Sequence, residues 1–204
     1  MAATIDALLP LSLLEAVRDV DRPTGDLDAE FVEELRNKRF GLSDTVYAQI
    51  QRYGEAVRRS QRLGFAEVEG LARLIGRRPD AEAVFRAAGR YLARQAYLTV
   101  PSTTRRVLLA LPALIARPMA LRHARRVARR YFGGSVSRVG STLLLDVPAS
   151  VTANVVPLGG GCAYYEDGFR ELLRLLVNGE SPVEHVSCAG RGDGRCRWRV
   201  EWTR

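Results

Sequence analysis

Residues 188–196 read Cys-Ala-Gly-Arg-Gly-Asp-Gly-Arg-Cys, a glycine-rich loop that begins and ends with a cysteine. The residues before the loop (183–188) and after it (196–203) have the composition of β-strands. In the second strand Trp198, Val200 and Trp202 alternate with charged residues. Glycine and aspartate favour tight turns between such strands. The sequence therefore predicts a β-hairpin in which the two cysteines converge.

The third cysteine, Cys162, precedes a predicted helix over 163–177, and His185 lies in the first strand of the hairpin. The spacing of the four residues is Cys-x22-His-x2-Cys-x7-Cys, ending at Cys188 and Cys196. Three thiolates and one imidazole suit a closed tetrahedral zinc site. His185 and Cys188 are three residues apart, so a regular strand would place them on opposite faces. A shared site therefore requires a β-bulge or an early end of the strand.

Other interpretations of these residues stay open. Zinc fingers and zinc ribbons pair two close-set ligand knuckles, and this spacing does not. Without a metal, Cys188 and Cys196 would be two thiols packed across a hairpin, and His185 an unrelated surface residue. Glu184 lies next to His185 and could compete with it as a ligand.

A second motif opens the predicted helix, where residues 160–169 read Gly-Gly-Cys-Ala-Tyr-Tyr-Glu-Asp-Gly-Phe. Together with the loop at 188–198, this motif resembles the closing half of the 4-vinyl reductase domain. That domain has a helix start marked by glycine and tyrosine, and a glycine-rich hairpin between two cysteines. The resemblance covers residues 135–204. The domain belongs to the same broad fold family as certain subunits of vesicle transport particles and the input modules of phenol- and xylene-responsive bacterial activators.

The resemblance implies both a site and a fold. In the activator modules three cysteines and one carboxylate hold a zinc ion. Cys162, Cys188 and Cys196 match the cysteine positions, and His185 falls on the carboxylate position. The implied fold is α+β, a helical layer packed on a small antiparallel sheet with a C-terminal zinc-pinned hairpin. It also implies a hydrophobic or aromatic ligand and a homodimer formed through the helical layer.

The rest of the chain reads as helices followed by strands. Pro23 and Gly25 follow a helical pattern over 5–20, which predicts an N-terminal helical arm over 1–26 and one domain over 27–204. Further helices are predicted over 27–37, 43–59 with Ser43 as N-cap, 65–75, 80–97 and 103–132, the last interrupted at Pro112 and Pro118. Strands are predicted over 135–139 and 141–147, on either side of a turn at Gly140.

The chain is basic, with a formal net charge of +8 and a sequence pI near 10.0. Arginine carries almost all of this charge, and Lys38 is the only lysine. Five arginines line one side of the helical pattern: Arg122, Arg125, Arg126, Arg129 and Arg130. A solvated helix face is the favoured interpretation, because no nucleic-acid reading motif accompanies them. Nucleic acid is therefore not an expected partner.

The composition and the start of the chain suggest a cytoplasmic protein. Three cysteines are an odd number, which argues against a secreted disulfide framework. Residues 1–10 lack the basic start of a signal peptide. The longest apolar run, residues 107–116, has about half the length that a membrane span needs.

The sequence contains no nucleophile–base–acid set, no recognisable carboxylate pair and no dinucleotide fingerprint, and a four-ligand zinc site leaves no open position for water. We therefore expect a binding protein, a sensor or carrier of a hydrophobic small molecule that signals through a protein partner. The residues expected to line its pocket are Val107, Leu108, Leu111, Leu114, Ile115, Tyr164 and Phe169. The alternatives are an accessory protein or reductase-like factor of bacteriochlorophyll and tetrapyrrole synthesis, and a protein scaffold of the transport-particle type.

Overall fold

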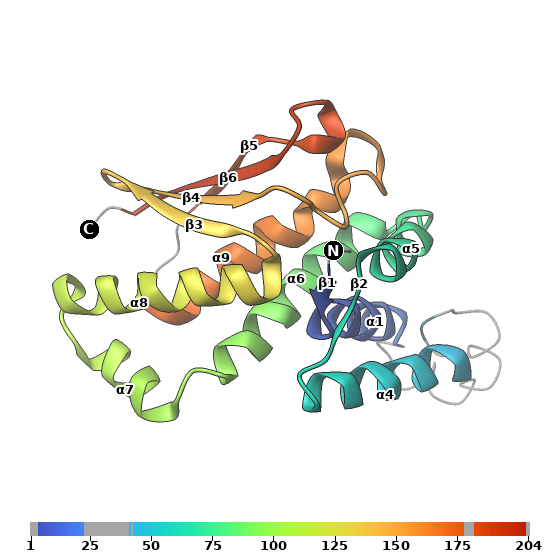
Figure 1. Ribbon diagram of the computed structural model, residues 1–204, viewed down its shortest axis with the longest axis horizontal. Helices are drawn as coiled ribbons and strands as arrows, with labels where there is room; N and C mark the ends of the chain where they lie inside the picture. Colours follow the sequence, from blue (N-terminus) through green and yellow to red (C-terminus); the bar gives the residue numbers. More distant parts are fainter. Residues whose placement is uncertain (1–3, 23–40, 42, 178–181, 203–204) are drawn as a thin grey trace.

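Helices cover one face of a small antiparallel sheet in the computed structural model, which describes residues 4–22, 41, 43–177 and 182–202 (Figure 1). The predicted α+β class is therefore confirmed. The predicted helix over 27–37 lies outside the described residues. The helices are α1 (Leu8–Asp21), α4 (Asp44–Arg58), α5 (Phe65–Gly76), α6 (Ala81–Leu98), α7 (Ser102–Ala110), α8 (Ala113–Val127) and α9 (Ala163–Val177).

The main sheet has the strand order β3-β4-β6-β5, with all neighbours antiparallel. Its strands are β3 (Ser135–Val139), β4 (Thr142–Val147), β5 (Val183–Ser187) and β6 (Cys196–Glu201). Along β6 buried and exposed residues alternate, and Trp198 is fully buried. The sheet therefore packs against the helices on one face only. A second, two-stranded sheet pairs β1 (Thr4–Asp6) with β2 (Arg62–Gly64).

Short helical turns connect these elements. The π-helical turn η2 (Ala128–Phe132) extends α8 towards β3, and two 3-10 turns, η3 (Pro157–Cys162) and η4 (Ala189–Arg191), lie at the helix and hairpin ends. Pro112 separates α7 from α8, whereas Pro118 lies inside α8 without ending it. Ser43 caps α4 as predicted, because its side-chain oxygen accepts a hydrogen bond from the Val46 backbone N–H. Within the described residues, no helix is both long and apolar enough to cross a bilayer.

The N-terminal helix α1 belongs to the main hydrophobic core. It packs on α6, α4 and α5, and most of its residues are buried, including Leu9, Leu13 and Leu14. The sequence analysis expected residues 1–26 to form an arm beside the domain. The structure differs because α1 presents leucines on several sides, and such a helix is stable only when other elements surround it.

The tightest helix contact joins α6 to α9. A Cβ atom at Gly89 of α6 would overlap the backbone of Tyr164 and of Gly168, so only glycine permits this approach. Arginines of α6 also contact buried carboxylates of α9: Arg86 donates to Asp167 at 2.9 Å and Arg94 to Glu171 at 2.9 Å. The other side of α9 reaches the sheet, where the rings of Tyr165 and Trp198 lie 5.3 Å apart. Helix α9 is therefore fixed between α6 and the sheet.

We expect Gly89→Ala to destabilise the protein, because its methyl group would push α6 away from α9. Overpacking in a core costs about 1–3 kcal/mol, and here backbone atoms block relaxation, so we expect a loss of about 3 kcal/mol. Urea unfolding followed by circular dichroism measures it. Gly70→Ala in α5 is the matched control, since no atom lies within 4 Å of its added Cβ. This control should gain about 0.5–1 kcal/mol in helix propensity. Equal effects of the two substitutions would contradict the packing argument.

Candidate metal centre

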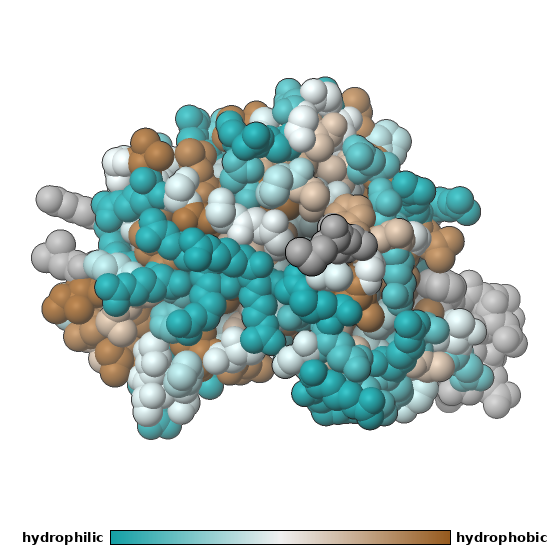
Figure 2. All heavy atoms as spheres, viewed as in Figure 1, coloured by the Kyte–Doolittle hydropathy of each residue, from teal (hydrophilic) through white to brown (hydrophobic). Residues whose placement is uncertain are grey.

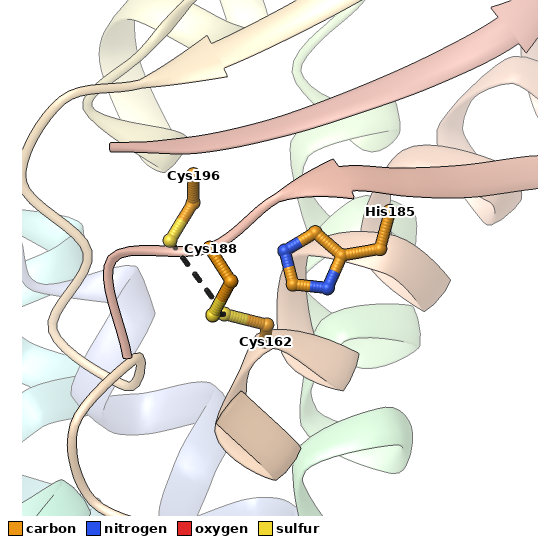
Figure 3. Close-up of side chains that lie close together, drawn as sticks. All are labelled: Cys162, His185, Cys188 and Cys196. Atoms are coloured by element: carbon orange, nitrogen blue, oxygen red, sulfur yellow. Dashed lines mark hydrogen bonds between the residues drawn. The ribbon is translucent and has the colours of Figure 1, made fainter. Parts of the chain in front are cut away.

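Four potential metal donors from separate parts of the chain converge near the end of the sheet (Figure 3). Cys162 ends η3, directly before α9, while Cys196 begins β6. His185 lies in β5, and Cys188 follows the end of that strand. One donor atom from each residue lies within 4.8 Å of all the others. The structure thus brings together the four residues that the sequence analysis named.

The distances between the sulfur atoms suit a tetrahedral metal. The Cys162 Sγ atom lies 3.5 Å from the Cys188 Sγ atom and 3.6 Å from the Cys196 Sγ atom. A zinc ion with Zn–S bonds of about 2.3 Å separates its sulfur ligands by roughly 3.8 Å. None of the three cysteines forms a disulfide, and all three are almost completely buried. Closing a tetrahedron around a zinc ion therefore requires only small shifts of these side chains.

A β-bulge resolves the orientation of His185 and Cys188. The register of β5 against β6 is regular up to His185, opposite Trp198, and then shifts so that Ser187 faces Arg197. The irregularity adds one residue to β5, which turns His185 and Cys188 towards the same side. The imidazole stacks on Trp198, with ring centroids 4.9 Å apart and an interplanar angle of 9°. The bulge that the sequence analysis required is therefore present.

The Nε2 atom of His185 points towards the cysteines (Figure 3) and is buried without a hydrogen-bond partner among the described residues. Leaving a buried ring nitrogen unpaired costs free energy, and a metal bond would satisfy it. Glu184 points away from the cluster: its side chain is 62% exposed and accepts a hydrogen bond from Arg199 at 2.6 Å. Of the two neighbours, His185 is the one placed to act as the fourth ligand.

The thiols influence each other's ionisation. The hydrogen bond with Cys162 lowers the pKa of Cys196, and His185 and the Ala189 N–H lower it further. The pKa of Cys162 is raised, first by its hydrogen bond to Cys196 and then by burial. The cluster therefore favours a thiolate at Cys196, and the thiolate is the form that binds a metal.

Backbone contacts around the cysteines hold the sulfurs in place. The Ala189 N–H donates to Cys196 Sγ at 3.3 Å, and the Cys188 N–H donates to the Asp193 carboxylate at 2.8 Å. Gly159 has a φ of +77°, and a Cβ there would press on Cys188 Sγ at 2.5 Å. Gly161 approaches the backbone of Thr152, whose hydroxyl donates to the Gly161 carbonyl at 2.7 Å.

The sequence analysis missed these supporting roles of Asp193, Gly159, Gly161 and Thr152. The signals were the Gly-Asp-Gly turn in the hairpin and the glycine triplet before Cys162. Gly159 leaves room for the Cys188 sulfur and Gly161 for the backbone of Thr152, so these two glycines of the triplet permit close packing.

The seven residues expected to line a ligand pocket have different surroundings. Tyr164 and Phe169 are fully buried in the core, and the Tyr164 hydroxyl lies 3.1 Å from that of Ser12. Leu108 is buried and Leu111 partly buried, whereas Val107 and Ile115 are 43% and 54% exposed. The side chain of Leu114 lies outside the described residues.

A small hollow of about 30 Å³ lies elsewhere, between β1, β2 and η2, and has room for one or two water molecules. Its lining includes Asp6, Arg62, Arg130 and Tyr165, and none of the seven expected residues. Tyr164 and Phe169 are fully buried, and the ligand pocket expected beside them stays a prediction.

We expect the purified chain to carry one zinc ion and Cys188→Ala to carry none. Zinc that binds only the folded state at a free concentration 1,000 times its Kd stabilises by about 4 kcal/mol, so the variant should lose about that much. Elemental analysis and thermal unfolding measure both effects. The control Arg126→Ala changes an exposed side chain of α8 that is not part of the cysteine cluster, and it should alter neither. Unchanged stability of the wild-type chain in a strong chelator would contradict a structural metal.

The fourth ligand is tested by comparing two adjacent residues. His185→Ala should weaken zinc binding more than a hundredfold, beyond the 10–100-fold loss typical of changes outside the ligand set. Glu184→Ala should leave the affinity within a few-fold of wild type, because its carboxylate pairs with Arg199 on the exposed side. Competition with a chromophoric chelator gives the affinities, and the absorption bands of the cobalt form report the donor set. Zinc loss in the Glu184 variant alone would assign the ligand to Glu184.

Comparison with known proteins adds no family assignment. The sequence matches no known protein-family model, and it matches no curated protein. The resemblance to the 4-vinyl reductase domain therefore stays a prediction, whereas the geometry of Cys162, His185, Cys188 and Cys196 itself favours a metal centre.

Proposed function

We propose that the chain is a small-molecule-binding protein whose fold is held by a structural zinc ion. The observation that carries the zinc assignment is the convergence of three buried sulfurs and the unpaired Nε2 atom of His185. Sulfur and imidazole donors in a tetrahedral arrangement favour zinc over the hard cations calcium and magnesium. When bound, the ion would neutralise the thiolates and connect the start of α9 to both strands of the hairpin.

The role that we propose for the ion is structural. Four protein ligands complete the tetrahedral coordination of zinc, so no position is left for water or substrate. The ligands belong to η3, β5 and β6 and to the loop after β5, so the ion would lock the sheet onto the helical layer. Three ligand cysteines also favour a reducing compartment such as the cytoplasm, since oxidation would remove the thiolates.

We infer that a hydrophobic ligand would enter between α7 and α9, next to Leu108 and Leu111. Helix α7 packs on α8 and α9, and neither α7 nor α8 has a side-chain cap at its N-terminus. A short helix with few anchoring contacts opens at lower free energy than the core around it. Opening of α7 would expose Leu108 and Leu111 beside the partly exposed Val107 and Ile115, giving apolar walls.

The homodimer expected from the resemblance is part of the same proposal. Tyr47 on α4 and Leu74 on α5 are 58% and 53% exposed, so the helical layer carries apolar side chains on its outer surface. Light scattering of the zinc-loaded chain would give its mass. A strictly monomeric chain would remove the dimer from the proposal and leave the ligand site unaffected.

We expect the intrinsic fluorescence of the chain to respond to small aromatic or aliphatic compounds. Both tryptophans lie in or next to β6. The guanidinium of Arg117 on α8 lies 5.7 Å from the ring centre of Trp202, so a movement of α8 would change the surroundings of the Trp202 ring. Leu108→Trp should fill the site and reduce ligand affinity at least tenfold while zinc stays bound. The matched control is Leu74→Trp on α5.

Native mass spectrometry of the purified chain would identify a bound compound directly. A porphyrin, visible by its absorbance, would favour the tetrapyrrole alternative. Tight binding to a larger protein together with no response to any small molecule would favour the scaffold alternative.

A further inference from the structure

The outward side of α8 has an unusual distribution of side chains. Its exposed residues recur at helical spacing: Ile115 and Pro118 in the first turns, then Arg122, Arg126 and Arg129 up to the π-helical turn. The opposite side is buried and made mostly of alanine, with Ala116, Ala120 and Ala124 in the core. We call Arg122, Arg126 and Arg129 the arginine face. On this side, α8 thus exposes apolar residues in its first turns and arginines along the remaining turns.

The arginine face differs from the arginines of α6 and α9 in its lack of acidic partners. On α6 and α9 the arginines pair with carboxylates: Arg86, Arg90, Arg94, Arg170 and Arg174 all contact Glu82, Glu166, Asp167 or Glu171. Among the described residues, no carboxylate lies within ion-pair distance of the arginine face. The reason is visible in the sequence, since residues 83–145 contain neither aspartate nor glutamate.

Neighbouring cations strengthen the positive potential at this surface. Arg125 donates from its Nε atom to the Val136 carbonyl, a neutral partner, so its charge is not compensated by that bond. Arg138 on β3, which packs beside α8, donates to the Gly140 carbonyl in the same way. Arg130 is the exception, because it pairs with Asp6 at 3.3 Å. Figure 2 shows the result as a continuous hydrophilic band over α8.

Apolar side chains lie at the end of this band. Figure 2 shows hydrophobic residues next to the band at the edge of the molecule where α7 turns into α8. Val107 and Ile115 there are 43% and 54% exposed. Leaving such side chains in water has a cost that burial in an apolar environment would remove, at about 25 cal/mol for each Å².

We propose that the arginine face, together with exposed Val107 and Ile115, binds the surface of a membrane that contains anionic lipids. The guanidinium groups would contact lipid phosphates, while the apolar side chains at the α7–α8 turn enter the boundary between headgroups and acyl chains. The axis of α8 would lie along the membrane plane, so the chain would bind the surface without crossing it. This partner accounts for both the charge and the exposed apolar groups of one continuous surface.

A nucleic acid explains less of this surface. Proteins that bind single strands interleave aromatic side chains with their cations so that bases can stack. Helix α8 contains no phenylalanine, tyrosine or tryptophan, and the side chains exposed beside its arginines are aliphatic. The membrane proposal is also separate from the zinc proposal, because the arginine face shares no residue with the metal centre.

The proposal is tested by sedimentation of the zinc-loaded full chain with phosphatidylcholine vesicles that contain or lack phosphatidylserine. We expect binding to the anionic vesicles only, and weakening as salt shortens the screening length from about 10 Å at 0.1 M to about 3 Å at 1 M. The triple variant Arg122→Glu, Arg126→Glu, Arg129→Glu should lose at least about a hundredfold in partitioning, because each cation near such a surface contributes roughly a fivefold gain.

A matched triple variant separates the local surface from net charge. Arg58→Glu, Arg59→Glu and Arg77→Glu change the same total charge at exposed positions on or beside α4 and α5, and should keep most of the binding. Ile115→Ser should lower partitioning about tenfold, whereas Leu98→Ser, equally exposed on α6, should not. Zinc content and melting temperature are measured on every variant. If the arginine-face triple does not fold, the Arg→Gln triple replaces it, with an expected loss of about a hundredfold.

Three results would overturn the proposal. The first is equal binding to vesicles with and without phosphatidylserine. The second is an equal loss in the two triple variants, which would make net charge, and not the arginine face, responsible. The third is binding of a labelled RNA or DNA oligonucleotide through the arginine face in the absence of any vesicle binding.

Discussion

The contact between α6 and α9 fixes the start of α9, where Cys162 of the candidate metal centre lies. Because Gly89 has no side chain, the backbones of α6 and α9 can touch near the start of α9. Helix α9 begins at Ala163, directly after Cys162. The buried carboxylates of α9 then bind arginines of α6, and hydrogen bonds from Arg174 and Arg94 lower the pKa of Glu171 to about 2. Stability from this carboxylate is therefore complete above the ordinary glutamate pKa and is lost progressively as the pH falls from that value through the folded-state pKa of about 2. A helix held this firmly can present one sulfur to the sheet at a fixed distance.

Local patterns in the sequence were sufficient to predict most elements. The helix over 163–177 begins and ends where predicted, and strands over 135–139 and 142–147 flank the turn at Gly140. These segments have a clear period, and their ends carry glycine, proline or a cap. The four residues of the candidate metal centre were also named from the sequence, because cysteine and histidine are rare in this chain and their chemistry restricts the choice of partners. The need for a bulge followed from the spacing of His185 and Cys188 alone, because residues three apart lie on opposite faces of a regular strand.

Tertiary burial was the part that sequence reasoning could not supply. The apolar pattern of α1 fits an arm that docks on a partner as well as a helix in the core, and only the packing on α6 and α4 decides between them. Local sequence patterns are equally insufficient to locate the expected ligand pocket. Tyr164 and Phe169 have the residue types of a ligand site, and the structure buries both of them completely. Whether an aromatic side chain lines a space or fills it depends on neighbours that are distant in the sequence.

The two proposals concern different parts of the molecule, the candidate metal centre at the hairpin and the exposed side of α8. At the candidate metal centre, three buried sulfurs surround a buried imidazole nitrogen that has no hydrogen-bond partner among the described residues, so a bound ion would complete the structure from inside. On α8 the exposed guanidiniums are hydrated, have no carboxylate partner among the described residues and lie beside exposed aliphatic side chains, so an external anionic surface could bind both. Since α8 packs on α9, and α9 begins at the metal centre, the same helical layer that the zinc would hold rigid also carries the arginine face. A rigid layer presents its cations together, and the contribution of each then adds to that of the others with little further loss of conformational entropy.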